Sequence, residues 1–300
     1  MMPSRRKDPG RRRSAAGLAA CLILGAAAPA RAEPGRADHL DSEHLFGFTE
    51  GSDIGVPGER EVELETTGRL GRRGGRFWAF DPTLALKLPV SAQLRVAPGL
   101  SFAGYAVAPG PGLPAAIRGG LNGGFVETRL RLLDRDASPV GLTLSVTPSL
   151  GTRDGTDARP ARAYGLDAAL LADHEFVPGT LVGAVNLGLS LAWSRASGTG
   201  EILRGSGLDL SAALARRVSA GLFLGGELRY LRAFDGLALD RFAGEAVYLG
   251  PTLYAALGET AWIGLTLGVQ VAGGAVGDGR PLDLAGFDRQ QLRLRIGASF

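Results

Sequence analysis

The last ten residues of the chain constrain its fold more than any other stretch. From Gln291 to Phe300, apolar residues occupy every second position, and the residues between them are polar or small. A period of two is typical of a β-strand with one apolar face. At the edge of a soluble sheet, such a strand would expose unpaired backbone groups beside an apolar surface and would promote aggregation. A closed barrel has no edge, so this C-terminus favours a barrel.

Segments with the same period recur from Glu61 to the end of the chain. We count twelve, and bacterial single-chain membrane barrels have an even number of strands. The expected fold is therefore all-β: a transmembrane, antiparallel, up-and-down β-barrel of twelve strands, in which closure makes the first and last strands neighbours. The apolar positions of the twelve segments span residues 62–70, 84–88, 94–102, 126–132, 140–146, 164–170, 181–193, 208–214, 222–230, 247–257, 263–271 and 292–300.

The connections between these segments alternate in length. Short ones at 89–92, 134–139, 173–180, 216–219 and 258–260 are separated by mostly longer ones at 107–122, 152–162, 194–203, 232–244 and 272–288, and only 71–75 departs from this rule. Membrane barrels have short periplasmic turns and longer outer loops. The pattern predicts that both chain ends lie in the periplasm.

Four aromatic residues support this orientation. Trp78, Tyr164, Trp193 and Tyr230 lie on the apolar face near the expected outer strand ends, where an interfacial girdle would form. A soluble two-sheet sandwich is the main alternative, because short alternating strands suit it as well. That fold would leave the terminal aromatic residue and the alternating loop lengths unexplained.

The N-terminus has the layout of an export signal. Basic residues within 5–13 precede an apolar stretch from Ala15 to Ala28, and an A-x-A cleavage site follows at residues 30–32. A lipoprotein signal ending at Cys21 is the alternative, but the apolar run continues past that cysteine. We expect a signal peptide at 1–32, a periplasmic or lumen-folded arm at 33–60 and an outer-membrane barrel at 61–300.

Removal of the signal changes the composition of the chain. The precursor has 33 basic and 30 acidic residues; the signal holds seven and one of these, which leaves 26 against 29. With no basic patch in the remainder, nucleic-acid binding has little support. Cys21 is the only cysteine, so the exported chain would lack disulfides, a catalytic thiolate and cysteine-ligated metals.

Two resemblances agree with these predictions. The final strand ending in Phe300 resembles the C-terminal signal that the barrel assembly machinery reads in outer-membrane β-barrels. The stretch His44–Gly55 (HLFGFTEGSDIG), with residues 61–66, 223–232, 239–244 and 250–254, resembles a family of poorly characterised, porin- or transporter-like outer-membrane barrels of alphaproteobacteria. This resemblance implies a barrel in the outer membrane and brings no substrate or catalytic residues.

Residues suited to catalysis are scarce. His39 and His44 lie in the arm and His174 in a predicted turn, so no strand supplies an imidazole base. There is no G-x-S-x-G or H-E-x-x-H motif. Asp41, Glu43 and His44 could bind a metal, but polar residues in an unstructured arm are usually solvated. We therefore expect no enzyme activity, no cofactor and no catalytic or metal site.

The polar faces of the strands carry many charges that would line the lumen. Interior charges need water or partners. Barrel closure should place Glu61, Glu63 and Glu65 beside Arg293 and Arg295, either as neutralising pairs that set the register or as the opposed charges of a porin constriction. The candidate lumen residues are Glu61, Glu63, Glu65, Arg95, Glu127, Arg129, Arg131, Asp167, Asp209, Glu227, Arg229, Arg293 and Arg295.

A barrel of twelve strands falls between small filled barrels and wide porins. The function expected is a passive channel for small polar or anionic solutes. A closed structural or surface-interaction barrel is the alternative, and a lipid-modifying enzyme is the third. Outer-membrane lipids and the barrel assembly machinery are the expected partners, and the oligomeric state is left open.

Overall fold

The computed structural model describes residues 40–72, 75–107, 116–155 and 159–300. The chain divides into two units, Met1–Arg31 and Ala32–Phe300, and the first lies outside the described residues. The signal peptide, the alternative lipoprotein signal at Cys21 and the place of His39 in the arm lie outside the described residues and remain sequence predictions. All of the described residues belong to the second unit.

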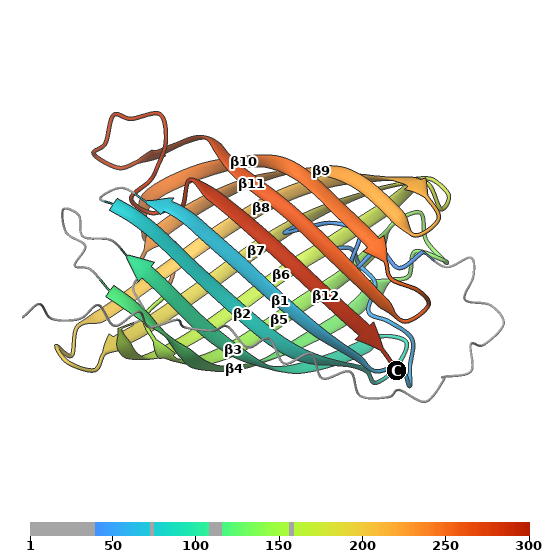
Figure 1. The fold of residues 1–300 in the computed structure, drawn as a ribbon, viewed down its shortest axis with the longest axis horizontal. Helices are drawn as coiled ribbons and strands as arrows, with labels where there is room; N and C mark the ends of the chain where they lie inside the picture. Colours follow the sequence, from blue (N-terminus) through green and yellow to red (C-terminus); the bar gives the residue numbers. More distant parts are fainter. Residues whose placement is uncertain (1–39, 73–74, 108–115, 156–158) are drawn as a thin grey trace, which may run out of the picture. The chain divides into compact units, whose positions relative to one another are not determined.

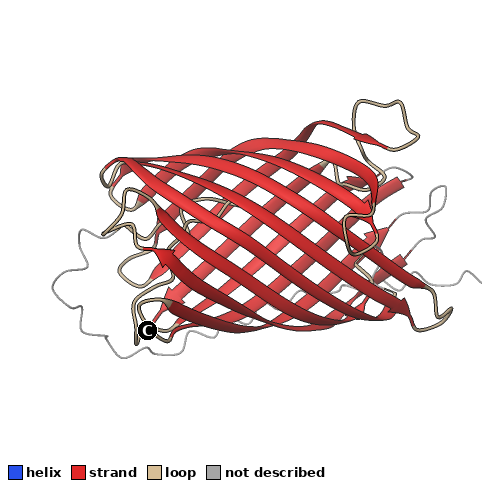
Figure 2. Ribbon diagram, turned by 180° about the vertical axis from the view of Figure 1, so that it is seen from behind, coloured by secondary structure: helices blue, strands red, loops and turns tan. Residues whose placement is uncertain are grey.

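The described residues form twelve strands that close into one antiparallel barrel, as predicted (Figures 1 and 2). Each strand pairs with the next one along the chain, and β12 pairs with β1. The strands are β1 (Glu61–Arg72), β2 (Gly75–Pro89), β3 (Leu94–Val107), β4 (Ala116–Leu133), β5 (Gly141–Arg153), β6 (Pro160–Val177), β7 (Leu181–Ala196), β8 (Ile202–Ser219), β9 (Leu222–Asp235), β10 (Arg241–Ala256), β11 (Ala261–Ala275) and β12 (Gln290–Ser299).

The alternation along the strands separates an apolar outer face from an inner face that carries the charged side chains together with some apolar patches, such as Phe77 with Tyr105. In β1, Leu64 is 45% exposed on the outside, whereas Glu63 is 5% exposed inside the barrel. Large apolar residues stay exposed in the same way around the wall, which suits contact with lipid hydrocarbon. Among the described residues, no helix is long and apolar enough to cross a membrane.

The two ends of the barrel differ from each other. The C-terminal rim, which includes Phe300 and the turns at 90–93, 134–140, 178–180, 220–221 and 257–260, also receives the segment before β1 (Figure 1). The opposite rim carries the other connections. There the strands run further than predicted: β6 begins at Pro160 and β7 ends at Ala196, so loops expected at 152–162 and 194–203 shorten to 154–159 and 197–201.

Backbone pairing explains why the strands run further than predicted. Ladder hydrogen bonds continue beyond the lipid-facing band and do not need apolar alternation. The pairing of Arg162 with Arg195 is one such polar rung. The connection at 276–289 is also shorter than the predicted 272–288, but it remains long. At the C-terminal rim, the turn predicted at 173–180 is also shorter, and His174 lies in β6, where its Nδ1 contacts the Pro139 carbonyl at 2.5 Å.

The four aromatic residues of the predicted girdle lie in strand halves near the opposite rim. Trp78 and Tyr164 are half exposed on the outer face. The rings of Tyr164 and Trp193 lie 5.3 Å apart on adjacent strands. The Tyr230 hydroxyl donates a 2.5 Å hydrogen bond to Glu245 on the neighbouring strand. These contacts are consistent with aromatic residues at a membrane interface.

Candidate functional site

The candidate functional site is the charged lumen, where residues 40–55 form a segment that we call the plug. The plug enters from the C-terminal rim and contains neither helix nor strand. Its backbone is bound by wall side chains: Thr49 N–H donates to Glu227 and Glu50 N–H donates to Asn186, both at 2.7 Å. Several plug side chains, such as Leu45 and Ile54, are completely or almost completely buried.

One side of the plug is held by apolar contacts. Leu45 and Phe46 pack against small and aromatic side chains of β7, β8 and β9, including Val182 and Phe223. The backbone also touches the wall at Gly47, where an added Cβ would lie 2.0 Å from Oγ1 of Thr266. Only glycine fits at that distance. The plug tip, by which we mean Gly47 and Phe48, therefore lies directly against β11.

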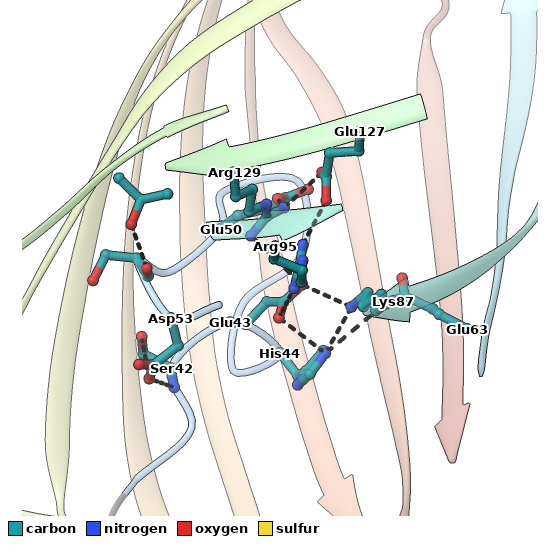
Figure 3. Close-up of polar contacts among 12 residues, drawn as sticks. Ser42, Glu43, His44, Glu50, Asp53, Glu63, Lys87, Arg95, Glu127 and Arg129 are labelled. Carbon is teal, nitrogen blue, oxygen red and sulfur yellow. Dashed lines mark hydrogen bonds and ion pairs between the residues drawn. The ribbon is translucent and has the colours of Figure 1, made fainter. Parts of the chain in front are cut away.

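The other side of the plug is held by charge around Lys87 of β2. The ammonium nitrogen lies 2.7 Å from Glu43, 3.0 Å from Glu61 and 3.0 Å from Nε2 of His44, and it also pairs with Glu63. Figure 3 shows Lys87 between Glu43 and His44 of the plug and Glu63 of β1. We call Lys87, Glu43, His44, Glu61 and Glu63 the Lys87 cluster. Buried charges of this kind are tolerated only when they are paired.

His44 is charged at neutral pH. Burial and the nearby ammonium of Lys87 would lower the pKa of its imidazole, but the carboxylate of Asp41, 2.7 Å from Nδ1, and those of Glu61 and Glu43 raise it to about 9. The pKa of Glu43 moves the other way: burial would raise it, but Arg95 and Lys87 hold it well below its usual range. The ring of His44 also lies 3.9 Å from that of Trp262.

The expectation that Asp41, Glu43 and His44 are solvated is wrong for two of them, because the lumen buries Glu43 and His44 to 2% exposure each. Ligand atoms of His44, Glu61 and Glu63 lie within 4.8 Å of one another, a spacing that could hold a metal. The ammonium of Lys87 already lies among them as a cation. The arrangement therefore fits a tethered ammonium rather than a metal ion.

Arg95 and Arg129 form a second charged group on adjacent strands. They lie directly opposite each other in the β3–β4 ladder and are 1% and 2% exposed. Glu127 lies 2.5 Å from Arg95 and 3.0 Å from Arg129. Each arginine also binds the plug, Arg95 through Glu43 and Arg129 through Glu50 (Figure 3).

The charges expected across the β1–β12 closure do meet. Arg293 pairs with Glu65 at 3.2 Å and Arg295 pairs with Glu63. The guanidinium of Arg293 also lies 4.3 Å from the ring centroid of Phe48 at the plug tip, and that of Arg229 lies 4.2 Å from it. Cations near an aromatic ring are attracted by its quadrupole. The tip is thus held between two arginines.

The other predicted lumen charges lie in the same interior. Arg131 reaches Asp53 of the plug at 3.6 Å, and Arg229 pairs with Asp209 at 2.9 Å. Asp167 lies away from the plug contacts and lines a cavity beyond them.

Sequence reasoning missed several wall residues that hold the plug, among them Lys87, Arg135, Asn186 and Asp173. Lys87 shares its strand face with Thr83 and Ala85, so that polar face could have predicted its inward direction. Arg135, which pairs with Asp53 at 3.0 Å and Asp173 at 3.3 Å, lies in a turn and had no such signal.

The cavity that Asp167 lines has a volume of about 930 Å³ and extends from the plug toward the opposite rim. Its lining includes plug residues Glu43 and Glu50, the wall charges Glu127 and Arg129, and Arg204 beyond them. Much of the rest of its wall is small or polar, including Thr83, Ala85, Ala97, Ser101, Ser149 and Ser194. The lumen therefore keeps an open space on one side of the plug, with charged groups at its base and a mixed wall of small, polar and apolar residues.

The model of a family of unknown function (DUF6662) matches residues 38–300. The chain belongs to this family. The residues matched by the DUF6662 model include both the plug and the barrel of this chain. The family description assigns no activity, and a predicted alphaproteobacterial origin is not tested by it. A comparison with curated proteins gives no match.

Solved structures similar to this DUF6662 chain are outer-membrane barrels. An outer-membrane channel from Pseudomonas putida F1 aligns over 90% of this chain and 100% of its own, with a TM-score of 0.57 and 14% identity. The β domain of a Bordetella autotransporter aligns over 82% of this chain and 100% of its own, with a TM-score of 0.50 and 16% identity. At these identities the likeness concerns the fold.

Proposed function

We propose that this chain is an outer-membrane channel for small polar or anionic solutes, and that the plug closes its lumen at the C-terminal rim. The observation that carries the proposal is the cavity of about 930 Å³ that ends on a plug held by ion pairs. In this proposal the C-terminal rim faces the periplasm and the cavity opens to the outside, as the short turns at the C-terminal rim suggest.

The composition of the cavity wall supports passage of polar solutes. Small barrels usually fill their interior with side chains. Here residues such as Ala85, Ser101 and Ser149 leave the space open, and charged groups surround its base. The plug precedes β1 in the chain and takes no part in the barrel ladder, so it can leave the lumen without breaking any hydrogen bond of the ladder.

Conductance of the refolded protein in planar bilayers tests the proposal. We expect brief openings for the full chain and a steady, larger conductance for a variant that lacks residues 40–55. In that variant, Arg293→Ala with Arg295→Ala should shift the reversal potential in a salt gradient toward cation selectivity. No conductance from a folded, inserted variant without the plug would contradict a channel.

A closed structural or surface-interaction barrel is the second candidate. The near-complete burial of Glu43 and His44 favours it, because a plug so deeply paired could be permanent. In that case, changes in the connection at 276–289 should alter the cellular phenotype more than changes in lumen arginines. Neither candidate includes catalysis.

A further inference from the structure

We propose that Arg95 and Arg129 form a carboxylate-binding site, that Glu43 and Glu50 of the plug occupy it as tethered ligands, and that solutes with two carboxylate groups displace them. The inference rests on the proposed channel function and names its substrate class. The plug would then leave when such a solute enters the cavity.

The first argument is the balance of charge at this site. Like charges directly opposite each other in a ladder are unfavourable unless anions lie beside them. The wall supplies Arg95 and Arg129 with one shared carboxylate, that of Glu127. Glu43 and Glu50 supply the others, so departure of the plug leaves two guanidinium groups with one partner.

The neighbouring Lys87 behaves differently. It keeps the carboxylates of Glu61 and Glu63 on the wall when the plug leaves. Arg131 keeps Asp134, and Arg135 keeps Asp173 and Glu175. The vacancy for an anion therefore arises at Arg95 and Arg129 rather than along the whole basic side of the lumen.

The second argument is unused hydrogen-bonding capacity. Among the described residues, Nε of Arg95 and Nε of Arg129 are buried without a hydrogen-bond partner, and Nη1 of Arg129 lies 3.5 Å from Glu43 without a hydrogen bond. One nitrogen of Arg129, Nη2, binds both Glu50 and Glu127. Buried donors are nearly always satisfied, and arginine binds carboxylates best through two parallel hydrogen bonds. A free carboxylate can use donors that the tethered glutamates leave open.

The third argument is access from the cavity. Its lining includes Arg129 together with Glu43, Glu50 and Glu127. The side chain of Glu50 is 22% exposed, whereas that of Glu43 is 3% exposed. A solute in the cavity therefore reaches the Glu50 position first. Its second carboxylate can then compete with Glu43 at Arg95.

Fluorescence of Trp262 reports release of the plug independently of conduction. The ring of Trp262 lies 3.9 Å from His44, next to Glu43 in the plug. The chain has three tryptophans, so Trp78→Phe with Trp193→Phe leaves Trp262 alone. We would titrate this protein in micelles with glutarate, and with acetate and sodium chloride at matched ionic strength.

We expect glutarate to shift the Trp262 emission to a saturating value, with weaker effects of acetate and chloride. Glu50→Gln should lower the half-saturating glutarate concentration about tenfold, because the plug is held less tightly. Arg129→Gln should abolish the glutarate response. Glu59→Gln on the segment that follows the plug, and Arg241→Gln on the opposite rim, should respond like the parent protein.

Equal responses to glutarate and to chloride at matched ionic strength would overturn the site, as would a glutarate response unchanged in Glu50→Gln. If Arg129→Gln does not fold, Arg129→Lys, which keeps the charge and loses the paired donors, should weaken the response. A Trp262 response without conductance would contradict the proposed channel and support the carboxylate-binding site. Conductance without a Trp262 response would support the channel and contradict the carboxylate-binding site.

Discussion

Arg295 on the last strand donates two hydrogen bonds to Glu63 on the first, from Nε at 2.8 Å and from Nη2 at 3.1 Å. The ladder places Arg295 opposite Glu65, so its side chain reaches two residues along β1 toward the C-terminal rim. Arg293 shifts in the same way and pairs with Glu65. The paired charges join the two ends of the barrel and also form part of the lumen around the plug.

Removal of Arg295 should destabilise the barrel strongly. Loss of one partner of a buried ion pair costs about 3–5 kcal/mol, because the other charge remains buried. We expect such a loss for Arg295→Gln and a smaller one for Arg295→Gln with Glu63→Gln, measured by urea unfolding in micelles. The exposed pair Arg241–Asp235 is the matched control and should give a coupling of about 0–1 kcal/mol. Additive effects at Arg295 and Glu63 would contradict a direct pair.

Substitution of Gly47 should dislodge the plug tip. The Cβ of alanine would lie 2.0 Å from Oγ1 and 2.4 Å from Cβ of Thr266, and overpacking of this kind costs about 1–3 kcal/mol. We expect Gly47→Ala to raise the open fraction in planar bilayers and Thr266→Gly to restore closure in the same protein. Gly198→Ala, which meets no atom within 4 Å, is the control. A closed Gly47→Ala channel would show that the tip is not part of the barrier.

Alkaline pH should release the plug. The pKa of His44 is raised from near 6.5 to about 9, so its stabilisation is complete below pH 6.5 and is lost as the pH rises through about 9. At roughly 1.4 kcal/mol per pKa unit, this loss is about 3 kcal/mol. The groups facing the imidazole are Asp41, Glu43, Glu61, Glu63 and Lys87. The open fraction should rise near pH 9, and His44→Gln should lack that step. An unchanged step in His44→Gln would assign it to another group.

Replacement of Lys87 should turn its cluster into a metal site. Lys87→Ala leaves a histidine and carboxylates, with the ligand atoms of His44, Glu61 and Glu63 within 4.8 Å of one another. Such ligands bind Zn²⁺. Titration calorimetry should show one bound Zn²⁺ in Lys87→Ala and none in Lys87→Ala with His44→Gln. Tight binding to the unchanged protein would show that the ammonium does not take the place of a metal.

Local periodicity was enough to predict the wall of the barrel. Because side chains alternate strictly along a strand, the position of Leu64 also determined that Glu63 faces inward. The same rule placed Glu63 and Glu65 near Arg293 and Arg295 once the barrel was closed. Strand ends were less predictable, since ladder hydrogen bonds extend into polar residues such as Arg162 that carry no apolar alternation.

The sequence by itself thus determined the number of strands, their order and the face of each lumen charge, because each follows from a period of two and from closure. Only the tertiary structure decided where residues 40–55 lie and which charges they meet. That segment has no period, and its partners, such as Asn186 for Glu50 and Glu227 for Thr49, are distant in the chain. Burial then turned Glu43 and His44 from residues expected in water into the ion pairs that hold the plug.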